Sequence, residues 1–177
     1  SADTNSFQLN LEELKKKISN RTKAIIINSP NNPSGVIYSE ETIKELSNIL
    51  REKELEFNKD IYLISDEPYR EIIYDNTKVP CILNYYNNSF IGYSYSKSLS
   101  LPGERIGYIV INPEMNTFEE ITSALNIANR ILGFVNAPSL FQRVIKESLK
   151  LEVDVNIYKK NRDLLYNHLV SIGFECL

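Results

Sequence analysis

The sequence has few of the residues that metal sites, disulfide frameworks and membrane spans require. Its two cysteines, Cys81 and Cys176, lie far apart without metal-ligand spacing, so we expect reduced thiols in a cytoplasmic protein. The one histidine, His168, falls on the polar face of a predicted helix, where an exposed structural role is expected. No apolar run approaches the roughly 20 residues of a membrane-spanning helix. Neither a metal site nor a membrane anchor is therefore predicted.

The sequence also lacks an excess of charge of one sign. Lys and Arg number 20 and Asp and Glu 23, which gives a net charge of −3 and no basic stripe. Nucleic acid is therefore not expected as a partner, because its phosphates bind clustered cations. The 177 residues suffice for about one domain with a core. Because the sequence starts without Met and stops in "SIGFECL", where an apolar pattern begins, we expect a segment of a longer parent protein.

Apolar runs and capping residues predict alternating strands and helices. Strands are expected at 23–28, 61–66, 89–94 and 105–112. Helices are expected after the N-caps Asn10 and Ser39, and at about 117–132, 138–150 and 153–172. The strands read as continuous apolar runs, which is typical of strands buried on both faces, so helices should cover both sides of the sheet.

The predicted fold class is α/β, with a mostly parallel sheet flanked by helices and one antiparallel strand. The antiparallel strand is expected because only ten residues link 89–94 to 105–112, too few for a helical crossover. Ligands of such sheets bind beyond the carboxyl ends of the strands. Polar residues gather at these ends, namely Asn32 after the first strand, Asp66 and Tyr69 after the second, Ser94, Ser96 and Lys97 after the third, and Arg105 at the start of the fourth.

These residue types together suit pyridoxal phosphate chemistry. A lysine desolvated beside a cation, here Lys97 near Arg105, loses its proton and becomes a nucleophile. Arginine and serine hydroxyls bind phosphate, and an aspartate can hold a protonated ring nitrogen. Each residue alone has a simpler explanation, such as a surface lysine, a turn serine or an arginine paired with Glu104 or Glu67. The functional hypothesis therefore depends on the whole set, in order, at the strand ends.

The sequence resembles the class I and II pyridoxal phosphate-dependent aminotransferases of fold type I, the aspartate aminotransferase-like family. "SPNNPSG" resembles the N-P-[ST]-G turn of that family, and "SDEPY" its D-x-x-Y strand end. "SYSKSLSLPGERIG" resembles its S-x-[SA]-K-x(5)-G-x-R-x-G signature. The three motifs occur in family order between Asn31 and Gly107, and the last is quite specific.

The resemblance implies a role for each matching residue. Lys97 would form the Schiff base with the cofactor, and Asp66 would pair with its ring nitrogen. Asn32 and Tyr69 would hydrogen-bond the 3-oxygen of the ring. Ser94 and Arg105 would bind the phosphate with help from Ser96, and Gly103 and Gly107 would let the backbone turn closely beside it. The implied catalytic residues are Lys97, Asp66 and Tyr69.

The resemblance also implies that part of the site lies outside this chain. The upstream phosphate loop, the stacking aromatic residue and the downstream arginine for the substrate carboxylate have no counterpart here. We therefore expect residues 1–152 to be part of the cofactor-binding large domain, and 153–177 the connecting helix and the start of the small domain. The parent is expected to be a homodimer, and the isolated chain is expected to be inactive.

The implied reaction is transfer of an amino group between an amino acid and a 2-oxo acid. A carbon–sulfur β-lyase would share every motif named here and differ in its substrate groove. The aminotransferase-like effector domain of a transcription regulator would need a helix-turn-helix upstream. An inert scaffold would not need Lys97, Asp66 and Arg105. The sequence does not identify the amino donor.

Overall fold

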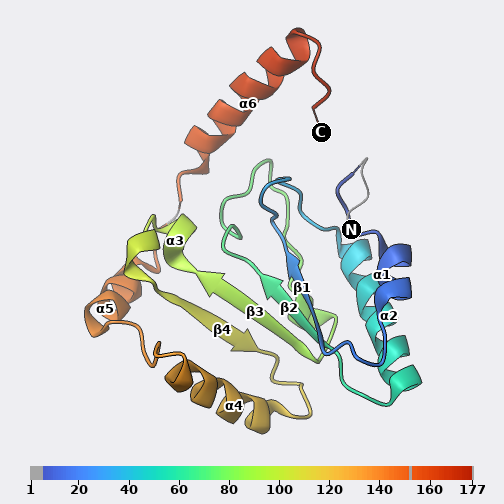
Figure 1. Ribbon diagram of the computed structural model, residues 1–177. Coiled ribbons are helices and arrows are strands. Elements are labelled where there is room, and N and C mark those ends of the chain that lie inside the picture. The colour runs from blue at the N-terminus through green and yellow to red at the C-terminus, as the bar shows by residue number, and fades with distance from the viewer. Residues whose placement is uncertain (1–5, 152, 177) are drawn as a thin grey trace.

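The computed structural model describes residues 6–151 and 153–176 and contains a mixed sheet within them (Figure 1). The strands, in spatial order, are β1 (Ala24–Asn28), β2 (Tyr62–Asp66), β3 (Ser89–Ser94) and β4 (Gly107–Ile111). The first three are parallel, and β4 runs antiparallel to β3. The predicted α/β class, the parallel pairs and the antiparallel strand are confirmed.

The helices agree with the predicted ranges to within a few residues at their ends. They are α1 (Leu11–Lys17), α2 (Glu40–Phe57), α4 (Phe118–Ile131), α5 (Ser139–Ser148) and α6 (Val155–Ser171). The structure adds the four-residue helix α3 (Tyr95–Ser98) and the 3₁₀ turns η1 (Ile82–Asn84) and η2 (Pro102–Glu104), which the apolar pattern did not predict. Each helix in the described ranges is too short or too polar to cross a membrane.

The predicted N-caps form the expected hydrogen bonds. The Asn10 side chain accepts from the Glu13 amide at 2.9 Å, and Ser39 Oγ accepts from the Thr42 amide at 3.1 Å. Both bonds satisfy amides that the first turn of a helix leaves without partners. The caps fix where α1 and α2 begin, and so fix which side of each helix faces the sheet.

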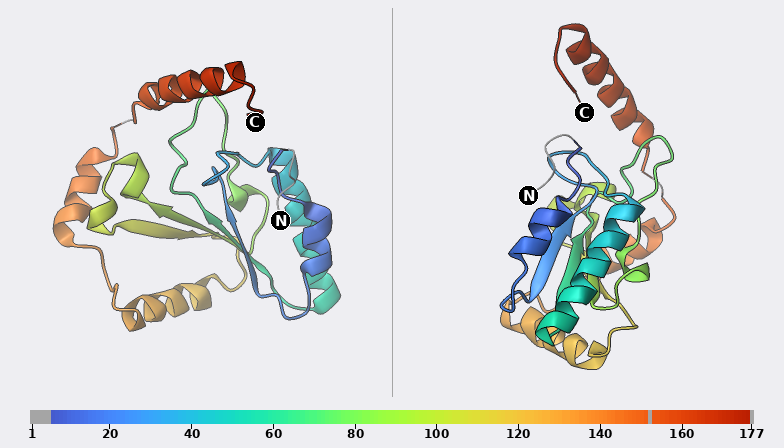
Figure 2. Two further views of the ribbon diagram at one scale, coloured as in Figure 1. Left: turned by 45° about the horizontal axis from the view of Figure 1, so that its top comes forward. Right: turned by 90° about the vertical axis from the view of Figure 1, so that its right-hand side faces the viewer.

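The core lies between one face of the sheet and the helices α1 and α2, which run side by side against it (Figure 2). The α2 side chains Ile43, Leu46 and Leu50 are almost completely buried there. On the opposite face, Ile26 of β1 is 70% exposed and Ile109 of β4 is 52% exposed. The expected helical cover of both faces is therefore not found among the described residues.

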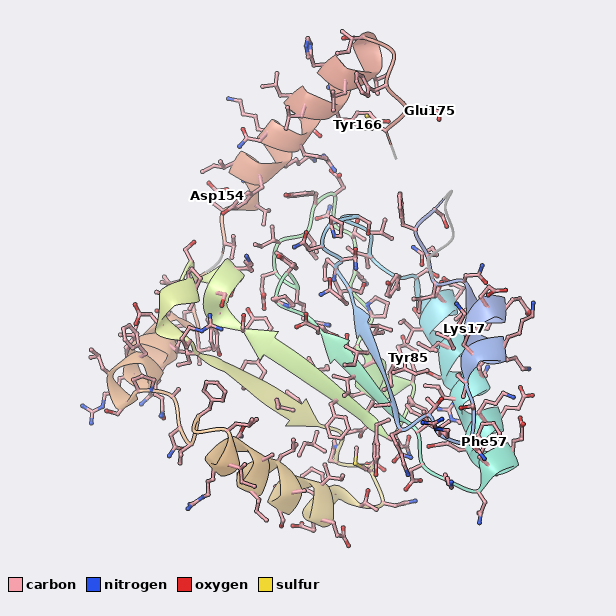
Figure 3. All side chains as sticks on the ribbon, viewed as in Figure 1. Lys17, Phe57, Tyr85, Asp154, Tyr166 and Glu175 are labelled. Atoms are coloured by element: carbon pink, nitrogen blue, oxygen red, sulfur yellow. The ribbon has the colours of Figure 1, made fainter. Side chains whose placement is uncertain are left out.

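The helices α4 and α5 lie on the β4 side of the sheet, and Figure 3 shows α6 with Tyr166 standing apart from the sheet. Among these three helices only Ile145 of α5 is buried. An apolar stripe shows that a helix needs a partner but does not identify that partner. For this reason the sequence predicted the ranges of these helices but not which surfaces they contact.

Gly107 is the position where β4 approaches β3 most tightly. A Cβ built on it would lie 2.3 Å from the Tyr93 carbonyl oxygen and 3.2 Å from Ser94 Cα. A Cβ on Gly103 would meet nothing within 4 Å. The close approach expected at both glycines therefore occurs at Gly107, and it is an approach to the neighbouring strand.

Gly107→Ala is expected to lower the free energy of unfolding by about 1–3 kcal/mol, because the backbone must move to admit the methyl group. Gly103→Ala is the matched control and should stay within about 0.5 kcal/mol of the wild type. Urea unfolding of both variants measures the difference. Equal stabilities for the two variants would contradict the close contact.

Candidate active site

The carboxyl ends of β1, β2 and β3 meet at one edge of the sheet. Asn28 is in register with Asp66, and Asp66 is in register with Gly92. Because side chains alternate along a strand, Asn28, Asp66 and Ser94 lie on the same face, the one that α1 and α2 leave open. These three residues of the candidate site therefore lie on the open face of the sheet, at its carboxyl edge.

Asp66 ends β2 with an exposed side chain that contacts the neighbouring strand. The Asn28 side-chain amide donates to Asp66 Oδ2 at 3.3 Å and to the Asp66 carbonyl oxygen at 2.8 Å. Although the residue is exposed, partial desolvation of the Asp66 carboxyl at the strand end raises its pKa above the ordinary value. Among residues 6–151 and 153–176 no salt bridge to this carboxylate is found, and a cation bound at this edge would favour its ionised form.

Asn28 is a residue that the motif comparison missed. Besides its bonds to Asp66, its Oδ1 accepts from the Asn32 amide at 2.9 Å. It therefore links the end of β2 to the turn that carries Asn32. The available signal was a polar residue closing the apolar run "KAIIIN", at a strand end where ligands are expected.

Asn32, Tyr69 and Lys97 form a continuous set of contacts, although they come from three different segments. The Asn32 side-chain amide donates to Tyr69 Oη at 3.3 Å. Lys97 Nζ lies 5.5 Å from the centroid of the Tyr69 ring, at cation–π distance. The structure thus brings together the predicted Schiff-base lysine and the two residues predicted to bond the ring oxygen.

The turn that carries Tyr69 is held by an ion pair whose carboxylate is buried. Glu67 is 1% exposed, forms a salt bridge with Arg70, and its amide donates to the Gly92 carbonyl at 2.9 Å. Arg70 also donates to the Val79 carbonyl at 3.1 Å. A charge this deeply buried is retained only when paired, so the pair fixes the backbone on both sides of Tyr69.

Ser94, Ser96 and Arg105 lie around the start of α3 and the turn before β4. Ser94 Oγ caps α3 by accepting from the Ser96 amide at 3.4 Å. Arg105 has a left-handed backbone, with φ 51° and ψ 49°, and donates to the Pro102 carbonyl at 2.7 Å. A strand cannot pass through this conformation, so β4 begins at Gly107 and the predicted start at Arg105 was wrong.

Asp66, Ser94 and Arg105 line one open hollow of about 1030 Å³, which α4 and the segment 133–138 border. Lys97, Tyr69 and Asn32 form the second group, and Asn28 contacts a member of each. The site residues are therefore arranged as two linked groups rather than one cluster.

Gly92 leaves the floor of this hollow flat between Asp66 and Ser94. A Cβ there would meet only the Ser65 carbonyl oxygen, at 3.9 Å, so packing does not require a glycine. The missing side chain makes room beside the carboxylate. The carboxylate and the serine–arginine pair of this hollow, together with the amine and the phenol–amide pair of the second group, fit pyridoxal phosphate in donor chemistry.

The fold and the site define an α/β protein that gathers these groups at the carboxyl edge of its sheet. The model of the family "Aminotransferase class I and II" matches residues 1–177. The chain belongs to the class I and II aminotransferases, a family that uses pyridoxal phosphate.

Relatives and solved structures agree with this assignment. A probable aspartate aminotransferase of Methanocaldococcus jannaschii is 33% identical over 177 residues, covering 94% of this chain and 44% of that protein. An aspartate aminotransferase of Pyrococcus horikoshii is 36% identical, covering 96% of this chain and 42% of that protein. The crystal structure of an amino transferase from Eubacterium rectale superposes with a TM-score of 0.96 at 52% identity, covering 98% of this chain and 44% of that one. The chain thus spans less than half the length of these proteins.

Proposed function

We propose that this chain supplies the lysine half of the active site of a pyridoxal phosphate-dependent aminotransferase. The enzyme transfers an amino group between an amino acid and a 2-oxo acid. The observation that carries the proposal is the contact of Lys97 with Tyr69, which itself accepts from Asn32, at the sheet edge where Asp66 ends β2. The family membership supports the same reaction.

The proposed roles follow from the chemistry of each side chain. Pyridoxal phosphate, when bound, supplies an aldehyde carbon and a ring that accepts electrons. Lys97 would hold it covalently through its amine, and as a free amine it would move the proton at the substrate α-carbon. Asp66 would favour a protonated ring nitrogen through its negative charge, and Asn32 and Tyr69 would donate to the ring oxygen.

The anion-binding end of the site is assigned to Ser94, Ser96 and Arg105. In the part of the chain that the structure describes, Arg105 uses Nη1 toward the Pro102 carbonyl, and a guanidinium has further donors with which it can bind two phosphate oxygens at once. Ser94 faces the same hollow, and Ser96 adds a hydroxyl at the first turn of α3. Charge and hydrogen bonds at this end would orient the cofactor so that its aldehyde lies near Lys97.

We use parent polypeptide for the longest natural polypeptide that contains these 177 residues. The proposals on substrate and on assembly apply to that polypeptide. We propose a cytoplasmic homodimer that uses an amino acid and a 2-oxo acid, without nucleic acid or membrane partners. Residues 1–152 would belong to its large domain and 153–177 to the connecting helix and small domain. Because several relatives are named aspartate aminotransferases, aspartate with 2-oxoglutarate is the first pair to assay.

The covalent role of Lys97 predicts a specific label. Borohydride reduction of the parent polypeptide loaded with pyridoxal phosphate, followed by peptide mapping, should place the pyridoxyl group on Lys97. Lys97 is the expected position because its amine lies beside Tyr69 at the carboxyl edge of the sheet. A pyridoxyl group found mainly on another lysine would overturn the proposed function.

A further inference from the structure

Tyr93 lies directly behind the candidate site and takes no part in the roles assigned above. It is the residue of β3 between Gly92 and Ser94, so its side chain points to the opposite face of the sheet from both. Tyr93 is 7% exposed. Its ring stacks on Tyr108 at 5.0 Å and meets the edge of Tyr95 at 5.2 Å, which fixes the direction of the hydroxyl.

The Tyr93 hydroxyl joins two segments that are far apart in the sequence. It donates to Glu71 Oε2 at 2.7 Å, and Ser98 Oγ lies 2.6 Å from it. Since the phenol proton is used toward Glu71, Ser98 is the donor in the second bond. The result is a chain of donors, Ser98 to Tyr93 to Glu71, that ends on a carboxylate, which makes both hydrogen bonds strong.

The two ends of this chain lie next to the functional residues. Ser98 follows Lys97 in α3, and Glu71 comes two residues after Tyr69. α3 has only four residues, too few for a helix to be stable by its own backbone hydrogen bonds. Something outside α3 must therefore hold it in place. The bond from Ser98 to the Tyr93 hydroxyl does so from the sheet.

We propose that Tyr93 is a positioning residue, which ties the turn of Lys97 to the turn of Tyr69 and so sets the distance between the Lys97 amine and the Tyr69 ring. That Lys97 and Tyr69 act in the reaction is part of the proposed function, and this inference depends on it. The link between the two turns depends only on the contacts of Tyr93. Burial raises the pKa of the Tyr93 phenol, and the Glu71 carboxylate raises it further, so the hydroxyl keeps its proton and remains a donor.

Hydrogen exchange without cofactor tests the tie. The amides of Leu99 and Leu101 both donate to the Tyr95 carbonyl at 3.3 Å and report on the opening of α3. In the cofactor-free parent polypeptide, Tyr93→Phe should raise their exchange rates about tenfold or more, because it removes a hydrogen bond to a charged group. Tyr108→Phe, which trims a neighbouring ring of the same cluster, should leave the rates within about twofold.

Variants at the two ends of the chain separate positioning from general loss of stability. Glu71→Gln keeps an acceptor for the Tyr93 hydroxyl. The Leu99 and Leu101 amides should therefore exchange more slowly in Glu71→Gln than in Glu71→Ala. Ser98→Ala should raise the exchange rates of the same two amides as Tyr93→Phe does. It replaces Tyr93→Phe as the test if that variant does not fold. In the loaded enzyme, Tyr93→Phe should lower kcat about tenfold while KM stays within about twofold, because the amine and not the substrate pocket is displaced.

The outcomes distinguish this inference from the proposed function. Faster exchange in Tyr93→Phe and Ser98→Ala supports the positioning role of Tyr93, whether or not borohydride labels Lys97. A missing label on Lys97 would contradict only the proposed function. Unchanged exchange in both variants overturns the tie even if Lys97 is labelled as expected. Equal effects of Glu71→Gln and Glu71→Ala would remove the acceptor role of Glu71 and overturn the donor chain.

Discussion

Replacing Lys97 by arginine is expected to lower aminotransferase turnover of the parent polypeptide by at least about 10³-fold, because a guanidinium stays protonated and cannot form the covalent bond or move the substrate proton. Arginine keeps a positive charge that can lie over the Tyr69 ring, so the fold should survive. Steady-state assays with aspartate and 2-oxoglutarate measure the loss. Peptide mapping after borohydride treatment should show no pyridoxyl group at position 97.

Lys44→Arg is a matched control for this substitution. Lys44 Nζ lies 5.9 Å from the Tyr85 ring centroid, so it makes the same kind of contact as Lys97, but it belongs to α2, which covers the face of the sheet opposite to the candidate site. Lys44→Arg should therefore leave turnover within about twofold of the wild type. If Lys97→Arg retained a comparable activity, Lys97 would not be the covalent residue and the reaction would have to be reassigned.

Local sequence signals predicted the elements of this fold well. The apolar runs "KAIIIN" and "SFIGYS" became β1 and β3, and Asn10 and Ser39 cap the helices that they were expected to cap. These signals succeed because a strand run or an N-cap depends on residues a few positions apart. The antiparallel β4 was predictable for a related reason, since chain length alone excludes a crossover.

Contacts between distant segments could not be predicted in the same way. The motifs identified Asn32, Tyr69 and Lys97, yet nothing local shows that Asn28 bonds to both Asp66 and the Asn32 amide. The Tyr93 chain likewise joins Glu71 to Ser98 through the sheet. The left-handed backbone of Arg105 was missed because an apolar run follows it directly and hides the turn. Tertiary contacts, rather than local propensity, decide these features.

Asp66→Asn is the second substitution with a large expected effect, a loss of turnover of about 10²-fold or more with cofactor still bound. The physical reason is that a neutral amide cannot hold the ring nitrogen protonated, so the ring accepts electrons less well. Asp60→Asn is the matched control, because Asp60 precedes β2 at its other end and accepts from the Asn88 amide at 3.3 Å, as Asp66 does from Asn28. Turnover near the wild-type rate in Asp66→Asn would remove Asp66 from the mechanism.

The same substitution should change stability in opposite directions with and without cofactor. Burial raises the pKa of Asp66, so its contribution to folding is complete below the unfolded-state value of roughly 3.9 and is lost as the pH rises through the folded-state value. Without cofactor, Asp66→Asn should therefore raise the melting temperature at about pH 7 and lose this advantage at about pH 3. A cationic ring nitrogen beside Asp66 favours the carboxylate, so with cofactor bound the variant should melt below the wild type. Thermal unfolding in both states measures these shifts, and a variant that is stabilised equally in both would show that Asp66 does not face a cation.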